Sequence, residues 1–303
     1  MQEILFNLSP VFGFFLFGIL LRRIGFMNQE QAGYLLKFVT FITLPALILV
    51  TVSQTKLTEQ TAYLPLISIM VDLSGMVLML ILFRLNKIER QTRGTMLIST
   101  MVTNNVYMFP FILAVYGQKG FADAALFDFG NALLTNTVTM AIAMYYGGKH
   151  SHLTIITKLL KTPLFWAVIL AVVMNLASID MPVVAEKFLT PIGQMTGPLI
   201  LIVLGVFFAP KRNDLALVVP TIVVRMGFGF LVGFTLASLL GLSGTTFAVV
   251  ALCSGAPIGF IVLSFSSIYH LNAQFAATAV SISVLLGMFI VPAVMYVLGV
   301  SLI

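Results

Sequence analysis

Two short segments place amides, small polar residues and a proline inside long apolar stretches of the chain. One is TNNVYMFPF, residues 103–111, and the other is CSGAPIG, residues 253–259. Prolines and small residues free backbone amide and carbonyl groups from helical hydrogen bonds, and lipid cannot bind those groups. Such interruptions survive inside protein or beside a water-filled cavity. The two segments therefore predict a binding site near the middle of the membrane, where two interrupted helices meet.

The chemistry of this predicted site favours an anion. The first turn after each interruption carries a partial positive charge and unpaired N–H donors, and side-chain amides add further donors and acceptors. We expect a small carboxylate to bind there. The alternative is that the prolines and asparagines only lock helices together. The candidate substrate-binding residues are Asn104, Asn105, Tyr107, Pro110, Asn131, Ser254, Gly255 and Pro257.

Three charged residues, Asp72, Asp128 and Arg225, lie within apolar segments. Each costs about 2.5–3.5 kcal/mol at a helix centre, so we expect each to face protein or water. Asp72 and Arg225 would meet if both lie near an axis that relates the two halves of the chain. They would then form either a structural ion pair or a coupling pair, in which Asp72 titrates or releases Arg225 to the substrate. Asn131 shares a helix face with Asp128. Asn131 is the better contact for an anion, because the carboxylate of Asp128 would repel a negatively charged substrate.

The composition excludes a soluble protein. Of 303 residues, 60% are hydrophobic and 9% are charged, and the mean hydropathy is +1.09. Apolar runs of the length that crosses a bilayer as a helix recur along the chain. The sequence predicts an all-α integral membrane protein with ten spans, at 4–21, 33–53, 61–83, 95–116, 121–146, 162–178, 187–209, 214–238, 245–269 and 272–299.

The basic residues of the predicted loops are unevenly distributed. Only three lie in one alternate set of loops: Lys56, Lys119 and Lys187. Eleven lie in the other set: Arg22, Arg23, Arg84, Lys87, Arg90, Arg93, Lys149, Lys158, Lys161, Lys211 and Arg212. Basic loops are retained in the cytoplasm, so we expect a multi-pass protein of a bacterial inner membrane with both termini outside.

The two halves of the sequence resemble each other. SPVFGFFLFGILL (9–21) matches TPLFWAVILAVVM (162–174), and four prolines pair in order, the last pair being Pro110 with Pro257. A repeat of five spans must insert with opposite topology, which is the inverted-repeat plan of many secondary transporters. We expect a first repeat at 1–146, a cytoplasmic linker at 147–161 and a second repeat at 162–303.

Several longer segments resemble the auxin efflux carrier (PIN-like) family, in its bacterial malate- or malonate-type permease branch. Together they span nearly the whole chain: 13–48, 104–136, 197–208 and 254–283. The resemblance implies broken, crossing helices 4 and 9, as in sodium–proton antiporters and bile-acid symporters. It also implies scaffold helices 1, 2, 6 and 7, transport helices 3–5 and 8–10, elevator-type movement and a homodimer. One departure is Thr103, which stands where the family usually has an asparagine.

The sequence predicts a secondary transporter that moves small organic anions, mono- or dicarboxylates, by alternating access. It contains no cluster of nucleophiles, acids or histidines that would suggest an enzyme. The alternatives are a carrier for another small solute, such as an amino acid, and a transporter-like solute sensor. Expected partners are a small organic acid, the lipid bilayer and a second copy of the chain, with no nucleic acid, cofactor or metal. Proton or sodium coupling stays open, although residues 100–112 and 251–262 contain no Asp or Glu, which favours uniport or proton symport.

Overall fold

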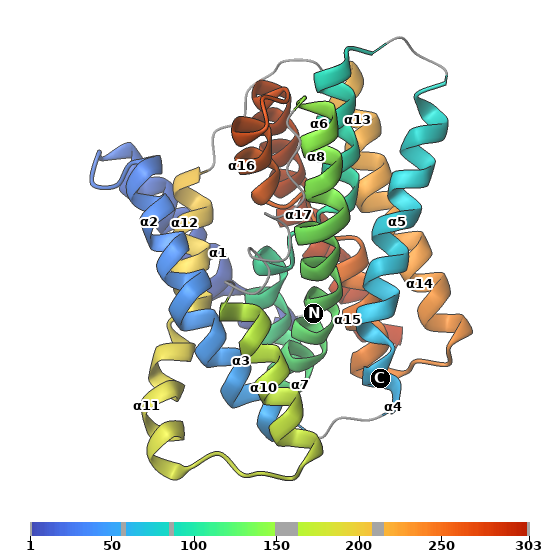
Figure 1. Ribbon diagram of the computed structural model, residues 1–303. Coiled ribbons are helices and arrows are strands. Elements are labelled where there is room, and N and C mark those ends of the chain that lie inside the picture. Colours follow the sequence, from blue (N-terminus) through green and yellow to red (C-terminus); the bar gives the residue numbers. More distant parts are fainter. Residues whose placement is uncertain (1, 56–58, 85–87, 149–162, 208–214, 302–303) are drawn as a thin grey trace. The chain divides into compact units, whose positions relative to one another are not determined.

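The computed structural model describes residues 2–55, 59–84, 88–148, 163–207 and 215–301 (Figure 1). The regular secondary structure of these residues is helical, and one isolated antiparallel bridge joins Thr103 to Ile258. This agrees with the predicted all-α class. Most of the predicted linker, 149–161, lies outside the described residues, as do seven of the loop lysines and arginines: Lys56, Lys87, Lys149, Lys158, Lys161, Lys211 and Arg212.

The chain forms two compact units, and both halves of the sequence contribute to each. The first unit comprises Met1–Ala62, Val106–Leu126 and Leu160–Phe208. Its helices outside 106–126 are α1 (Gln2–Arg23), α2 (Gln29–Phe38), the π-helix η1 (Val39–Thr43), α3 (Leu44–Gln54), α4 (Glu59–Ala62), α10 (Pro163–Leu176), α11 (Val183–Gln194) and α12 (Thr196–Phe207).

The second unit comprises Tyr63–Asn105, Phe127–Leu159 and Ala209–Ile303. Helix α7 (Asn105–Leu134) contributes to both units and has non-helical torsion angles at Gly117. The other helices of the second unit are α5 (Leu64–Leu82), α6 (Arg90–Met101), η2 (Thr135–Thr139), α8 (Met140–Tyr146), α13 (Leu215–Ile222), η3 (Val223–Phe228), α14 (Gly229–Leu239), α15 (Gly244–Ser254), α16 (Ile261–Ile268) and α17 (Ala273–Ser301).

Every apolar segment predicted as a span is largely helical in the structure. Within the described residues, five helical stretches are both long enough and apolar enough to cross a membrane: Gln29–Gln54, Glu59–Leu82, Val183–Phe207, Leu215–Leu239 and Ala273–Leu298. The total of ten spans stays a prediction. The first unit contains the predicted scaffold spans together with residues 106–126, which the prediction had placed with the transport helices.

Close backbone approach holds the first unit together where α1 crosses α12. A Cβ atom on Gly18 would meet the backbone of Ile202 and Gly205, and one on Gly205 would meet the backbone of Phe15 and Gly18. Small residues at such crossings let helix backbones approach closely, which is how helices associate in lipid.

A side-chain amide completes the end of α3 in the first unit. The Nδ2 group of Asn175 lies 2.9 Å from the carbonyl oxygen of Val52, 3.0 Å from that of Ser53 and 2.7 Å from that of Thr55. The last carbonyls of a helix have no partner within the helix, so an amide donor there replaces bonds that lipid could not supply.

In the second unit, α5 packs against α6 and α14, and α17 packs against α13, α15 and α16 (Figure 1). Most of α6 and α15 is buried, including all of Gly94–Met101 and Ala248–Ser254. The ends of these two helices are therefore surrounded by protein, which is the setting that non-helical backbone requires in a membrane protein.

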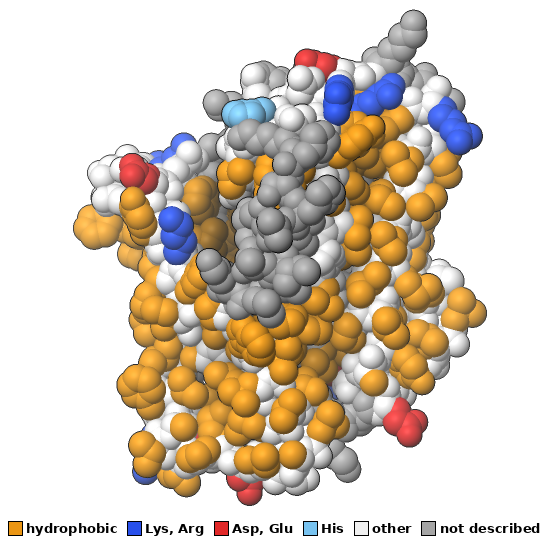
Figure 2. Space-filling model, in the orientation of Figure 1, with side chains coloured by type: hydrophobic (Ala, Val, Ile, Leu, Met, Phe, Trp, Pro, Cys, Tyr) orange, Lys and Arg blue, Asp and Glu red, His pale blue; other side chains and the backbone are white. Residues whose placement is uncertain are grey.

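The surface of the second unit separates apolar sides from a basic end. Figure 2 shows hydrophobic side chains along α5 and α14, and Lys and Arg side chains where α5 ends and α6 begins. Exposed residues on α5 include Leu66, Met70 and Val77, whereas Arg84 and Arg90 are exposed at the basic end. Apolar sides with basic ends are typical of helices that cross a bilayer.

We predict that Gly205→Ala destabilises the protein by roughly 1–3 kcal/mol, because the added methyl group has no space at the α1–α12 crossing. The measurement is thermal or denaturant unfolding of the purified protein in detergent. Gly13→Ala is the matched control, since a Cβ atom at Gly13 of α1 has no neighbour within 4 Å. Gly13→Ala is expected to be neutral or slightly stabilising, and equal losses from the two variants would contradict the tight crossing.

Candidate functional site

The two predicted interruptions appear as gaps between helices. Helix α6 ends at Met101 and α7 begins at Asn105, and α15 ends at Ser254 whereas α16 begins at Ile261. The residue after α6, Val102, has an extended backbone. Residues 102–105 are buried, and residues 256–259 are buried as well.

The two non-helical segments satisfy each other's backbone groups. The backbone N–H of Asn104 donates to the carbonyl of Pro257 at 2.9 Å, and the N–H of Gly259 donates to the carbonyl of Val102 at 3.0 Å. The side-chain amide of Asn104 also reaches the carbonyl of Ile258, at 3.4 Å. Asn104 therefore links the two interruptions, through its backbone and its side chain.

Arg225, in η3, binds the carbonyl ends of both interrupted helices. Its guanidinium donates to the carbonyl oxygens of Ser254 at 2.6 Å and Thr100 at 3.2 Å, and its Nε group donates to that of Ala256 at 3.4 Å. The last carbonyls of a helix lack intrahelical donors and carry partial negative charge. A buried cation placed on two such ends replaces donors that neither helix can supply.

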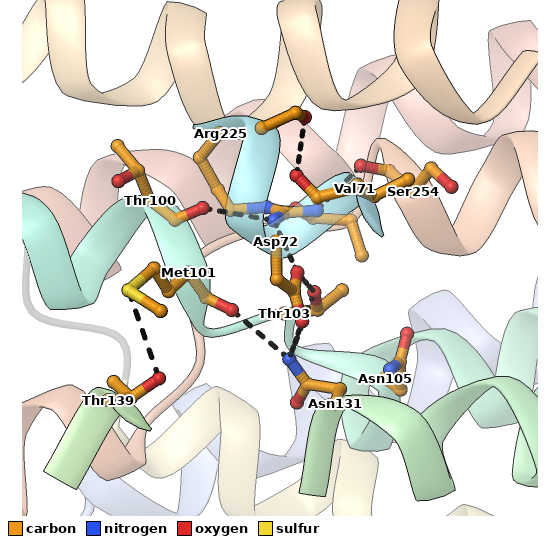
Figure 3. A network of polar contacts seen from close by, with 12 residues as sticks. Val71, Asp72, Thr100, Met101, Thr103, Asn105, Asn131, Thr139, Arg225 and Ser254 are labelled. Carbon is orange, nitrogen blue, oxygen red and sulfur yellow. Dashed lines mark hydrogen bonds and ion pairs between the residues drawn. The ribbon is translucent and has the colours of Figure 1, made fainter. Parts of the chain in front are cut away.

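Asp72, on α5, is the ionic partner of Arg225 (Figure 3). Its Oδ1 atom lies 3.1 Å from Nη1 of Arg225, and the two side chains are 0% and 1% exposed. The hydroxyl of Thr103 donates to the same oxygen at 3.0 Å, and the amide of Asn131 donates to Oδ2 at 2.7 Å. Both carboxylate oxygens are thus hydrogen-bonded, as a buried ion pair requires.

The side-chain amide of Asn131 is hydrogen-bonded within this polar network and is not left open to a ligand. Besides Asp72, its Nδ2 group lies 3.2 Å from the carbonyl oxygen of Met101 and 3.3 Å from the hydroxyl oxygen of Thr103. Its amide hydrogens are therefore directed to protein acceptors. The structure places this predicted substrate contact where it orients Asp72 and covers the last carbonyl of α6.

Asp128 and Asn105 form a second, smaller group. The Nδ2 group of Asn105 donates to Oδ1 of Asp128 at 2.9 Å. Asp128 is 8% exposed and Asn105 is 1% exposed. Asn105 is the first residue of α7, so this carboxylate lies next to a helix start, where negative charge is favoured.

Two residues of the opening segment lie outside this network. Tyr107 and Pro110 belong to the part of α7 that lies in the first unit. The predicted interruption at 103–111 does not extend to Pro110, because Pro110 lies inside α7. Proline there costs one helical hydrogen bond without ending the helix. Pro257 accepts a hydrogen bond from Asn104, whereas the comparison of the two halves of the sequence matched Pro257 with Pro110.

Ser254 and Gly255 contribute their backbone and small size. The Ser254 carbonyl accepts from Arg225, and its hydroxyl lies where a Cβ atom on Gly233 of α14 would be. A Cβ atom on Gly255 would lie 3.1 Å from Cβ of Phe230. Both residues therefore permit close packing of α15 against α14.

The sequence reasoning missed Thr100 and Ser283. The Thr100 carbonyl accepts from Arg225, and the Ser283 hydroxyl accepts from the backbone N–H of Ile258 at 3.1 Å. Neither residue stands out by type in an apolar helix. Thr103 was noted only as a departure from the family pattern, and it proves to be a hydrogen-bond donor to Asp72.

Comparison with known proteins decides the family. The family model described as "Membrane transport protein" matches residues 4–296. The chain belongs to this family. The predicted membership of the auxin efflux carrier family is thereby confirmed, and the protein is a multi-pass membrane transporter.

Two relatives extend the comparison over most of the chain. An uncharacterized transporter of Methanocaldococcus jannaschii is 23% identical over 291 residues, which cover 91% of this chain and 92% of the relative. An uncharacterized transporter of Methanothermobacter thermautotrophicus is 23% identical over 285 residues, with the same coverage.

Among the residues that the structure describes, no three or more His, Cys, Asp or Glu side chains form a group that could hold a metal ion. The described residues at the crossing of the two interruptions supply one ion pair, one further carboxylate, amides and helix ends.

We predict that the two members of the buried ion pair depend on each other for their contribution to stability. Asp72→Asn alone or Arg225→Gln alone should lower the free energy of unfolding by roughly 3–5 kcal/mol, because each leaves a buried charge without its partner. The double variant should lose clearly less than the sum of the two. The measurement is a double-mutant cycle of denaturant unfolding in detergent.

The control cycle combines Asp72→Asn with Gly13→Ala, which lies on α1 in the first unit. These two changes share no contact and should add. Additive losses for Asp72→Asn and Arg225→Gln would show that the two side chains do not depend on each other.

Proposed function

We propose that this membrane transport protein is a secondary transporter that moves small organic anions, mono- or dicarboxylates, by uniport or proton symport. The substrate binds at the crossing of the two interruptions. In an elevator-type cycle, the second unit carries it across the bilayer. The protein acts in the cytoplasmic membrane with both termini outside and as a homodimer.

The observation that carries this proposal is the mutual bonding of the two interrupted segments. Non-helical backbone is costly at membrane depth, and here two such segments meet and bond to each other. Interrupted helices at equivalent places of two halves mark the binding site in many secondary transporters. Helices that only pack together would need neither interruption, because the backbone groups of a continuous helix are hydrogen-bonded within the helix.

Contacts between equivalent positions support the proposed inverted repeat. Thr196 bonds to Thr43 through their hydroxyl groups at 2.9 Å, and Arg225 bonds to Asp72. In both cases the partners are 153 residues apart, and the same separation joins Asn104 to Pro257. Residues related by a twofold axis meet only close to that axis, so one constant separation supports a pseudo-twofold relation.

The starts of α7 and α16 supply the anion preference. Each follows an interruption, and the first turn of a helix offers N–H donors and partial positive charge to a carboxylate. Asn104 and Asn105 lie directly at the first of these starts. Arg225 is not available to the substrate in this state, because carbonyl groups and Asp72 already bind it.

A zwitterionic substrate such as an amino acid is the second candidate, and one observation favours it. Asp128 places a carboxylate beside Asn105. A simple anion would be repelled by an ionised Asp128, whereas an amino acid brings a positive group as well as a carboxylate.

We predict that small carboxylates or amino acids raise the unfolding temperature of the purified protein and show counterflow in liposomes. Asn104→Ala combined with Asn105→Ala should abolish both effects, because it removes the side chains that link and flank the interruptions. The measurement is thermal-shift screening of organic acids and amino acids, followed by exchange of a radiolabelled hit.

The matched control is Asn136→Ala in η2, whose amide bonds only within its own helix region, to the carbonyl of Ala132 at 2.8 Å. It should retain stabilisation and counterflow. Full activity of the Asn104→Ala, Asn105→Ala variant would place the substrate elsewhere. Solute flux without saturation or counterflow would indicate a channel, and binding without exchange would indicate a sensor.

A further inference from the structure

Asp128 is a buried carboxylate with a single hydrogen bond shown to a side chain, from Nδ2 of Asn105 at 2.9 Å. The oxygen of the same amide, Oδ1 of Asn105, is buried and has no hydrogen-bond partner in the described part of the chain. Asp128 and Asn105 therefore place two hydrogen-bond acceptors, a carboxylate oxygen and an amide oxygen, on either side of one amide group. Acceptors in a buried position call for a donor or a cation.

The charges of the second unit do not balance around Asp128. Arg225 is paired with Asp72 and so does not neutralise Asp128. No Lys, Arg or His side chain described by the structure lies within 4.0 Å of the Asp128 carboxylate. The start of α7 offsets part of its charge, equivalent to about half an elementary charge at most.

We propose that Asp128 and Asn105 form a subsite for a singly charged cationic group. This group is either the ammonium group of the transported solute or a monovalent metal ion that binds together with a carboxylate solute. The inference rests on the proposed transport of a carboxylate and adds to it the second charge that the site recognises.

The contacts give Asp128 and Asn105 different roles in this subsite. Asn105 fixes the carboxylate by donating to Oδ1, which leaves the lone pairs of Oδ2 to the incoming cation. The backbone of Asn105 starts α7, whose first N–H groups attract the solute carboxylate. One residue thus places a positive helix end beside a negative side chain, and a zwitterion or a carboxylate with its counterion matches both.

The experiment compares ligands that differ only in the positive group. Alanine is paired with propionate and aspartate with succinate, and each is titrated against the purified protein by thermal shift in choline chloride. Each carboxylate is then titrated again with sodium chloride replacing choline chloride at equal ionic strength. The variants are Asp128→Asn, which keeps the shape and loses the charge, and Asn105→Ala, which keeps the charge and loses its anchor.

Two results support the subsite. If the substrate supplies the cation, an amino acid binds at least about tenfold more tightly than its deaminated partner, and Asp128→Asn removes that preference. If a metal ion supplies it, sodium instead of choline tightens binding of the carboxylate about tenfold or more, and Asp128→Asn removes the sodium effect. Asn105→Ala should weaken the same preference without abolishing it, which keeps the test informative if Asp128→Asn fails to fold.

The matched control is Asp123→Asn, the same substitution on the same helix but in the first unit, at a residue that is also buried. It should leave both preferences unchanged. The proposal is overturned if neither the ammonium group nor sodium tightens binding to the wild-type protein, or if Asp128→Asn keeps the preference. Failure of the transport proposal would give a different result. No carboxylate would then show counterflow, whereas the effect of sodium on the thermal shift, and its loss in Asp128→Asn, could still be measured.

Discussion

The crossing depends on one cation placed where two helices end. Arg225 donates to the carbonyls of Thr100 and Ser254, at the last turns of α6 and α15. Both ends are buried, so water and lipid headgroups cannot complete them. Without Arg225, two sets of partial negative charges would converge in an apolar interior with no donor. The non-helical segments that follow these ends can exist at this depth because the guanidinium covers the carbonyls that precede them.

A buried guanidinium needs a counterion, and this requirement accounts for the rest of the network. Asp72 supplies the charge, while Thr103 and Asn131 hold its two oxygens. Asn131 also binds the last carbonyl of α6 through Met101. The group is neutral as a whole and its hydrogen-bonding capacity is used internally. It is therefore suited to maintaining the crossing of the two interruptions.

Residues that are 153 positions apart in the sequence contact each other in both units of the chain. The Thr43–Thr196 contact lies in the first unit, and the Asp72–Arg225 and Asn104–Pro257 contacts lie in the second. Asp72 in the first half of the sequence thus forms an ion pair with Arg225 in the second half.

The sequence alone determined the membrane class, the family, the helical segments and the two places where helices stop. These features are local: hydropathy, helix length, proline and glycine act within a few residues of one another. Only the tertiary structure decided the roles of the polar residues. Asn131 faces Asp72, Ser254 packs toward Gly233, and Pro110 lies inside a helix although its segment was expected to be interrupted. Each role depends on partners far away in the sequence, because a buried polar group takes its function from whatever segment the fold places within hydrogen-bonding distance.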